Sequence, residues 1–368
     1  MSSLYEKYNL KQVINASGRM TILGVSTPRA EVADVVNYGL NHFFEMKDLV
    51  NKTGAYIAKM LNVENAVVVS CASSGIAQSV AAVIVKDDAW LLENLHAEPL
   101  NVPNEIVLPK GHNVNFGAPV ATMVTLGGGK IREAGYANEC SAAQFAAAIT
   151  PRTVALLYIK SHHSVQKSIL SVEEAAAVAR EHNLPLIVDA AAEEDLTCYY
   201  QMGASLVIYS GAKAIEGPTS GLVLGKHHYV EWVKLQSNGI GRAMKVGKEG
   251  ILGLTQAIES YTQLPKTTGQ EMVDKMTPFI DSLNKLNGVS ARVVWDSAGR
   301  DIARTEIAFD EATLGWKTKA IVDALKTGEI AIYFRGYRAN EGKIEVDVRS
   351  VTPPQLEIIA QCIKQLFV

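Results

Sequence analysis

Short apolar runs alternate with amphipathic segments between residues 66 and 224. Each run is bounded by Gly, Pro or small polar residues, which is typical of buried strands. The runs are Ala66–Ser70, Glu105–Leu108, Val154–Ile159, Leu186–Val188, Leu206–Tyr209 and Leu222–Leu224. The segments between them, such as Ile76–Val85 and Ala142–Ile149, are predicted helices. This alternation predicts an α/β fold with a mostly parallel central sheet and helices on both faces.

The pattern changes after about residue 266, where strands and helices no longer alternate regularly. Helices are predicted at Asp274–Leu286, Thr318–Leu325 and Gln355–Leu366, and strands at Ala291–Trp295, Arg304–Phe309, Ile330–Phe334 and Ile344–Val348. This mixture predicts a smaller α+β domain. We therefore predict three parts: an N-terminal arm and helix (1–48), a large domain (49–248), and a long connecting helix with the small C-terminal domain (249–368).

The composition is that of an ordinary globular protein, and it argues against several classes of function. Lysine and arginine number 35 and aspartate and glutamate 38 among 368 residues, a formal net charge of −3. This balance favours neither nucleic acid nor a membrane surface as a partner. The four cysteines are scattered, and no Cys/His cluster predicts a metal site. Because no apolar leader and no stretch of ~18 apolar residues is present, we expect a cytoplasmic protein.

Two charged residues follow predicted buried strands. Asp189 comes directly after Leu186–Val188, and Lys213 comes after Leu206–Tyr209 and Ser210. Ligands of open α/β sheets bind outside the carboxyl ends of the strands, which is where we expect these two side chains.

A lysine and an aspartate at such a site suit pyridoxal 5'-phosphate. The lysine forms a Schiff base with the cofactor aldehyde, and the carboxylate keeps the pyridine nitrogen protonated. The alternative is a surface lysine and an aspartate that caps a helix. The occurrence of both, with Ser210 just before Lys213 and flanking glycines, favours the cofactor. We therefore predict Lys213 and Asp189 as the catalytic residues.

Further cofactor contacts are predicted around this pair. Ser73, Ser74 and Gly75 follow a strand and open a helix, so their N–H and hydroxyl groups could hold the phosphate together with Ser210. Serine also caps helices without any ligand, and that alternative stays open.

Two residues outside that loop complete the predicted cofactor site. His112 follows Glu105–Leu108 and could stack on the cofactor ring, or could be an ordinary histidine with satisfied hydrogen bonds. Thr219, in the turn 217–221, is free to face another subunit, so we expect a homodimer or a higher homo-oligomer.

Cations are candidates for holding an anionic substrate. A guanidinium fork suits a carboxylate, and Arg19 and Arg349 are the candidates for that contact. Arg242 and Lys245, in the glycine-rich basic segment 239–248, could bind a distal phosphate. Solvated side chains, or an ion pair of Arg349 within the small domain, are equally compatible with the sequence.

Three motifs resemble the fold-type I pyridoxal phosphate enzymes and, within them, the selenocysteine synthase (SelA-like) family. Tyr209–Lys213 and Gly217–Gly221 resemble that family's S-G-D-K…G-G-P-Q-A-G segment, and Val13–Gly18 resembles its I-N-A-T-G start. Two features depart from the family pattern. Ala212 stands where the family has Asp, and Ser70–Ser74 replaces the Asn-rich phosphate loop of the selenium transferase.

The resemblance implies a pyridoxal phosphate-dependent carbon–nitrogen lyase. The small-molecule branch of the family implies an ammonia-lyase for a phosphorylated 2-amino sugar acid. The alternatives are a selenium transferase acting on seryl-tRNA, another pyridoxal phosphate-dependent lyase or aminotransferase, or a cofactor-free scaffold. Similarity begins near residue 12, without the transferase's extra RNA-binding region, and the net charge is −3. We therefore expect no tRNA partner.

Overall fold

The computed structural model describes residues 3–97, 101–161, 163–265, 267–296 and 301–367. They form two compact units. The large unit is Pro28–Gln263, and the small unit combines Met1–Thr27 with Leu264–Val368.

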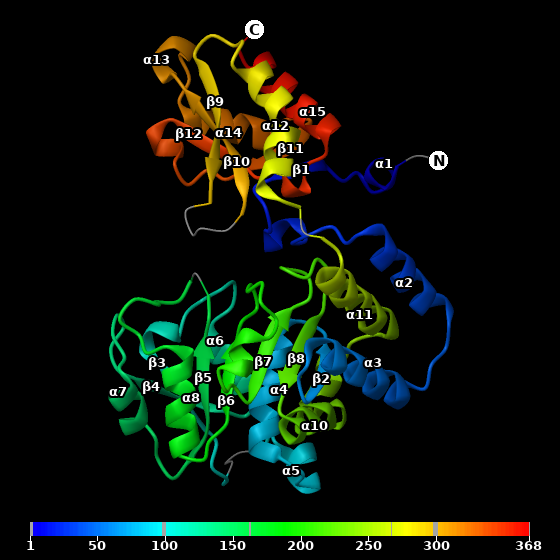
Figure 1. Ribbon diagram of the computed structural model, residues 1–368, viewed down its shortest axis with the longest axis vertical. Coiled ribbons are helices and arrows are strands. Elements are labelled where there is room, and N and C mark those ends of the chain that lie inside the picture. The colour runs from blue at the N-terminus through cyan, green and yellow to red at the C-terminus, as the bar shows by residue number, and fades with distance from the viewer. Residues whose placement is uncertain (1–2, 98–100, 162, 266, 297–300, 368) are drawn as a thin grey trace. The chain divides into compact units, whose positions relative to one another are not determined.

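The large unit is built on a twisted sheet (Figure 1). Its strands are β2 (Asn65–Val69), β3 (Glu105–Pro109), β4 (Lys130–Ala134), β5 (Thr153–Ile159), β6 (Leu186–Asp189), β7 (Leu206–Ser210) and β8 (Gly221–Gly225). Among the described residues the strand order is β2-β8-β7-β6-β5-β3-β4. The neighbours from β7 to β4 are parallel, and β8 is antiparallel to β2 and β7. This is the mostly parallel sheet that the sequence predicted.

Helices cover both faces of this sheet. They are α2 (Ala30–Asn41), α3 (Met46–Leu61), α4 (Ala72–Val85), α5 (Ala89–Asn94), α6 (Val120–Leu126), α7 (Ala142–Ala147), α8 (Val172–Glu181), α9 (Cys198–Gln201), α10 (His227–Leu235) and α11 (Lys248–Gln263), with the 3₁₀ helices η2 (Lys110–His112), η3 (Gln236–Asn238) and η4 (Ile240–Met244). Val188 and Val207 pack in a hydrophobic cluster with α3, α7, α8 and α11. Ile187 and Ile208 pack in another with α4, α5, α6 and α10. Successive strand residues thus point to opposite faces, and both faces are buried.

The small unit is the α+β domain that the sequence predicted. Its three-stranded antiparallel sheet has the order β12-β10-β9 among the described residues, and a parallel pair joins β1 to β11. The strands are β1 (Gln12–Ala16), β9 (Val289–Trp295), β10 (Ala303–Phe309), β11 (Ile330–Phe334) and β12 (Lys343–Val346). The helices are α1 (Leu4–Tyr8), α12 (Gly269–Leu283), α13 (Glu311–Leu314), α14 (Thr318–Thr327) and α15 (Pro353–Gln365), with the 3₁₀ helices η1 (Thr21–Leu23), η5 (Ala339–Glu341) and η6 (Val348–Ser350).

The compact units divide the chain at 27/28 and 263/264, whereas the predicted boundaries follow residues 48 and 248. The N-terminal arm lies in the small unit because β1 pairs with β11 along its whole length. Helices α2 and α11 both lie in the large unit, where Ser260 Oγ donates to the Glu31 carboxylate at 3.2 Å. Pairings between segments so far apart in sequence leave no local pattern in either segment, so residue spacing could not reveal them.

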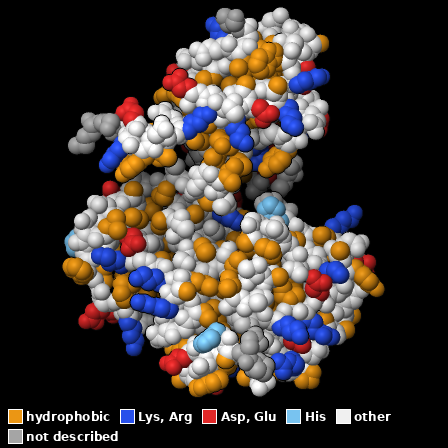
Figure 2. All heavy atoms as spheres, turned by 180° about the vertical axis from the view of Figure 1, so that it is seen from behind, with side chains coloured by type: hydrophobic (Ala, Val, Ile, Leu, Met, Phe, Trp, Pro, Cys, Tyr) orange, Lys and Arg blue, Asp and Glu red, His pale blue; other side chains and the backbone are white. Residues whose placement is uncertain are grey.

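The surface charges are mixed. On the face drawn in Figure 2, lysine and arginine side chains are interspersed with aspartate and glutamate, without a broad field of one sign over the described residues. No described helix combines the length and the apolar character that a membrane crossing requires.

Candidate active site

The carboxyl ends of the parallel strands meet at one edge of the large sheet. Asp189 of β6 pairs with Ile208 of β7, two residues before Ser210. Ser210 and Val69, at the ends of β7 and β2, both pair with Gly221, which begins β8. The residues that follow β2, β6 and β7 are therefore brought together, although they are far apart in sequence.

Asp189 is the last residue of β6, and only 6% of its surface is exposed. Burial raises the pKa of its carboxyl to about 6, although the positive charge of Lys213 and the Ala191 N–H, which donates at 3.2 Å, both favour the ionised form. Asp189 ends β6 and Lys213 follows the neighbouring strand β7, so the two predicted catalytic residues share this end of the sheet. Even so, one lysine does not offset the cost of burying the charge, so the site suits a further cation.

Lys213 lies in a tight turn between β7 and β8. Its N–H donates to the Ser210 carbonyl at 3.3 Å, and the N–H groups of Gly217 and Gly211 donate to the carbonyls of Gly211 and Ser220 at 2.7 and 2.8 Å. The alanines on either side of Lys213 are buried, whereas the lysine is half-buried. The fold thus fixes the backbone of the turn and leaves this lysine partly accessible.

The N-terminus of α4 carries the serines predicted to bind phosphate. Ser74 and Cys71 cap the helix reciprocally, because the Ser74 N–H donates to Cys71 Sγ at 3.3 Å and the Cys71 N–H donates to Ser74 Oγ at 3.1 Å. Ser70 Oγ donates to Ser74 Oγ at 3.0 Å. Ser73 and Ser74 both lie in the first turn, where backbone N–H groups and the helix dipole favour an anion.

Close backbone approaches hold this helix end against the sheet. A Cβ on Gly221 would lie 2.6 Å from the carbonyl carbon of Cys71, and a Cβ on Gly75 would lie 2.9 Å from Ile208 Cγ2. Only glycine allows these contacts without a shift of the neighbouring atoms. Because Gly221 also pairs with Ser210, the predicted phosphate-binding residues share the sheet edge with Asp189 and Lys213.

His112 is fully buried, with 0% of its surface exposed. Its Nε2 donates to the Val165 carbonyl at 3.0 Å, its Nδ1 accepts from the Ile159 N–H at 3.3 Å, and its ring meets Tyr158 edge-on. Burial lowers the pKa of His112 to about 4, so the ring is neutral at physiological pH. Stacking of His112 on a cofactor remains a prediction. It would require one face of the imidazole ring to be accessible. Thr219, by contrast, is exposed.

The four cations predicted to bind substrate lie in different units. Arg242 and Lys245 are exposed residues of the large unit, in and directly after η4. Arg349 belongs to the small unit, where its Nε and Nη2 bind both carboxylate oxygens of Asp347 at 2.9 and 2.7 Å. Arg19, also in the small unit, is half-buried. Substrate binding by these residues stays a prediction.

Lys160 also lies at this edge of the sheet, although no role was predicted for it from the sequence. It follows β5 directly, and its N–H donates to the Asp189 carbonyl at 2.8 Å. Its Nζ donates to Gln166 Oε1 at 3.2 Å, and its charge contributes to lowering the pKa of His112. The signal that selected Lys213, a lysine at the carboxyl end of a buried strand, could also have selected Lys160.

The residues at this edge fit pyridoxal phosphate. The α4 N-terminus and the serine hydroxyls suit its phosphate, and the buried Asp189 suits its protonated pyridine nitrogen. The half-buried Lys213 amine suits its aldehyde. With this sheet, they define a pyridoxal phosphate-dependent enzyme of fold type I.

The chain belongs to the L-seryl-tRNA selenium transferase (SelA) family, whose model matches residues 75–293. It is 41% identical to the D-glucosaminate-6-phosphate ammonia lyase of Salmonella typhimurium, over 99% of this chain and 98% of that protein. It is 36% identical to a 5'-C-glycyluridine monooxygenase-decarboxylase of a Streptomyces species, over 99% and 92% of the two chains. A solved structure of D-glucosaminate-6-phosphate ammonia-lyase matches with a TM-score of 0.95 at 40% identity, over 100% of this chain and 98% of that one.

Proposed function

We propose that this chain is an ammonia-lyase for D-glucosaminate 6-phosphate or a closely similar phosphorylated 2-amino sugar acid. The products are 2-keto-3-deoxygluconate 6-phosphate and ammonia. The observation that carries the proposal is the 41% identity over nearly the full length of a lyase of that name. The nearby Lys213 and Asp189 side chains supply the groups that such a reaction needs.

Bound pyridoxal phosphate supplies an aldehyde for the substrate amino group and an electron sink for the bonding electrons left at the α-carbon. Lys213 would hold the cofactor through its aldehyde until the substrate amine takes that place. Its free amine then removes the proton from the α-carbon, and the 3-hydroxyl leaves as water. Overall, the water lost with the 3-hydroxyl would be matched by one water taken up, which supplies the 2-keto oxygen as ammonia is released.

The other residues of the sheet edge bind and orient. The Asp189 carboxylate holds a proton on the pyridine nitrogen, which keeps the electron sink effective. Ser73, Ser74 and Ser210 bind the phosphate at the N-terminus of α4. The Gly75 N–H donates to the Cys71 carbonyl at 3.0 Å, so Gly75 contributes by letting this helix end lie close to the sheet. In a cytoplasmic homodimer or higher homo-oligomer, the exposed Thr219 of a neighbouring subunit adds a further contact.

The substrate's two anionic ends require cations. Arg19 or Arg349 is proposed for the carboxylate, since a guanidinium fork matches its two oxygens. Arg349 would have to share its fork with Asp347. Arg242 and Lys245 are proposed for the distal phosphate because both are exposed.

A second candidate function is supported by one specific observation. The monooxygenase-decarboxylase relative also spans nearly the whole chain, at 36% identity, so the fold can host an oxygen-dependent reaction. A selenium transferase acting on tRNA is less supported, because the charges in Figure 2 are mixed and the net charge is −3.

The test is a product assay on the purified enzyme loaded with pyridoxal phosphate. D-glucosaminate 6-phosphate, unphosphorylated D-glucosaminate and 5'-C-glycyluridine are compared with and without oxygen. We expect equal amounts of ammonia and 2-keto-3-deoxy acid from the phosphorylated sugar acid, independent of oxygen. Oxygen uptake with carbon dioxide release from the nucleoside would favour the second candidate. Loaded enzyme that releases no ammonia from any phosphorylated 2-amino sugar acid would refute the proposal.

A further inference from the structure

The segment 190–197 connects Asp189 to helix α9 at the edge of the cofactor site. It begins with Ala190, Ala191 and Ala192, followed by Glu193, Glu194 and Asp195. Alanine side chains form no hydrogen bonds, and consecutive acidic side chains repel one another. Asp195 orders the C-terminal end of the segment, because its Oδ1 accepts from the N–H groups of Thr197 and Cys198 at 2.8 and 2.9 Å. The alanines before it offer no side-chain hydrogen bond of their own.

Two hydrogen bonds of the Ala191 backbone link the segment to both ends of the cofactor site. The Ala191 N–H donates to Asp189 Oδ1 at 3.2 Å, and the Ser210 N–H donates to the Ala191 carbonyl at 3.1 Å. The Ala190 N–H also donates to the Ile208 carbonyl at 2.9 Å. A shift of Ala191 would consequently move the carboxylate assigned to the pyridine nitrogen and the serine assigned to the phosphate.

Three tyrosine hydroxyls hold the segment from three separate elements. Tyr199 of α9 donates to Glu193 Oε2 at 2.8 Å. Tyr209 of β7 donates to the Asp195 carbonyl at 2.9 Å, and Tyr261 of α11 donates to the Glu194 carbonyl at 2.7 Å.

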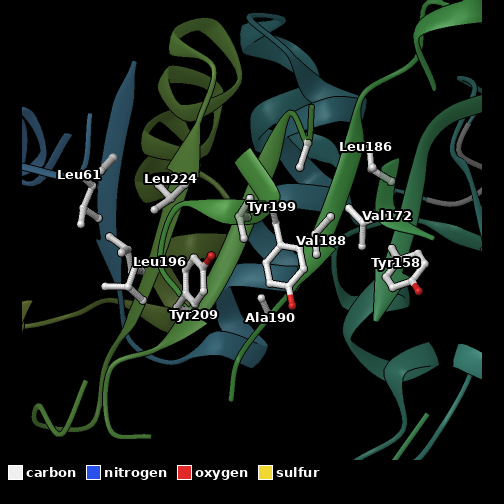
Figure 3. Close-up of a cluster of buried hydrophobic side chains, with 14 of the residues drawn as sticks. Leu61, Tyr158, Val172, Leu186, Val188, Ala190, Leu196, Tyr199, Tyr209 and Leu224 are labelled. Carbon is white, nitrogen blue, oxygen red and sulfur yellow. The ribbon is translucent and has the colours of Figure 1, made fainter. Parts of the chain in front are cut away.

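The tyrosine rings are anchored in the core. Figure 3 shows Tyr199 and Tyr209 in the hydrophobic cluster that also contains Ala190 and Leu196. Tyr209 is 1% exposed and Tyr199 6% exposed, and Tyr261 packs against the same cluster. Burial raises the pKa of Tyr199 and of Tyr209 well above the usual value, so both hydroxyls stay protonated donors. Fixed rings whose hydroxyls donate to the segment can therefore hold its path between Asp189 and α9.

We propose that Tyr199, Tyr209 and Tyr261 are positioning residues, which fix the segment 190–197 and thereby place Asp189 and Ser210 against pyridoxal phosphate. The inference concerns cofactor binding and makes no use of the substrate. It is therefore tested separately from the proposed reaction.

The test compares Tyr209→Phe and Tyr261→Phe with the matched control Tyr158→Phe. Tyr158 is 3% exposed and lies in the same hydrophobic cluster, but its hydroxyl donates to the Leu170 carbonyl, outside the segment. Each replacement removes one hydroxyl and keeps the ring, and Tyr209 and Tyr158 are similarly buried. Tyr261→Phe is the test variant less prone to misfolding, because Tyr261 is only partly buried.

Three measurements are made on each variant. Hydrogen–deuterium exchange of the cofactor-free protein reports the mobility of residues 189–199 and the protection of the Ser210 amide. Titration with pyridoxal phosphate gives the cofactor affinity. The pH dependence of the bound cofactor's absorption reports the influence of Asp189 on the pyridine nitrogen.

We expect Tyr209→Phe and Tyr261→Phe to speed exchange of the segment about fivefold and to weaken cofactor binding about threefold to tenfold. The absorption titration should shift by about half a pH unit. Tyr158→Phe should change none of the three, whatever its effect on the melting temperature. The proposal is overturned if both test variants match the Tyr158→Phe control in exchange, affinity and absorption.

Discussion

Two buried aspartates at strand ends, one in each unit, lie in opposite electrostatic surroundings. Asp189 ends β6 of the large unit and is 6% exposed, and Asp347 follows β12 of the small unit and is 0% exposed. Burial raises the pKa of Asp189 to about 6, since Lys213 offsets only part of the cost. At Asp347 burial acts in the same direction, but Arg349 and Arg304 outweigh it and lower the pKa to about 2.

The difference separates a structural charge from a functional one. Arg349 binds both oxygens of Asp347, and Arg304 Nε lies 3.4 Å from Oδ2, so the chain itself neutralises that carboxylate. Asp189 lies in a site that suits a cation from outside, and the protonated pyridine nitrogen of the cofactor is such a cation. A buried carboxylate whose pKa remains raised is therefore the better marker of the active site.

Lys213→Ala should have the largest effect. Loss of the amine that links to the cofactor and moves the α-proton should lower ammonia release at least about 10³-fold. Because the cation beside Asp189 is also lost, the pKa of that carboxyl should rise further above about 6. Lys110→Ala is the control, since Lys110 also follows a strand end but pairs with Glu133 at 3.6 Å. Normal activity in Lys213→Ala would break the assignment.

Asp189→Asn should lower activity about 10²-fold, because an amide cannot hold the pyridine nitrogen protonated as firmly. The same change should stabilise the cofactor-free protein at pH 7.5 by up to about 3 kcal/mol, because no charge remains to be buried. Ammonia assays and urea unfolding measure the two effects. A cofactor-free Asp189→Asn protein less stable than wild type would contradict the electrostatic account.

The pH dependence of the stability gained in Asp189→Asn follows from the raised pKa of Asp189. The folded protein binds the Asp189 proton more tightly than the unfolded chain, so wild-type stability should fall as the pH rises from about 4 to about 6. Asp189→Asn should lack this component. The advantage of the variant should therefore be absent near pH 4 and complete above about pH 7.

Asp347→Asn should show the opposite behaviour. The change removes a carboxylate that Arg349 and Arg304 both face, while Arg304 keeps its 2.9 Å pair with Asp296, so we expect a cost of about 2 kcal/mol. Since the pKa of Asp347 is lowered to about 2, its contribution should be present above about pH 4 and lost toward pH 2. Thermal unfolding of the small unit at several pH values measures this. Equal stabilisation by Asp347→Asn and Asp189→Asn would remove the distinction between the two sites.

Gly221→Ala should have the smallest effect and probes the phosphate end of the site. The new Cβ would lie 2.6 Å from the Cys71 carbonyl carbon and push the α4 N-terminus away from Ser210. We expect cofactor affinity to fall about tenfold, in line with a cost of ~1–3 kcal/mol for overpacking. Gly336→Ala is the control, because its Cβ would have no atom within 4 Å. Unchanged cofactor binding in Gly221→Ala would argue against a phosphate site at this helix end.

Much of the large unit was predictable from local pattern. The strands ending at Asp189 and Ser210, and the helix after Ser70, lie within one to four residues of the predicted positions, because buried strands and capped helices leave short-range signals. The N-terminal arm was not predictable in this way. Gln12–Ala16 joins β11 over three hundred residues away, and neither segment carries a mark of its partner.

The sequence by itself determined the fold class and the cofactor chemistry, because a lysine and an aspartate after buried strands, with serines opening a helix, are local features. The tertiary structure decided which charges balance within the chain. In the folded chain Arg349 binds Asp347, His112 is buried as a neutral ring, and the pKa of Asp189 is raised. These outcomes depend on burial and on distances between residues remote in sequence, and no spacing along the chain encodes them.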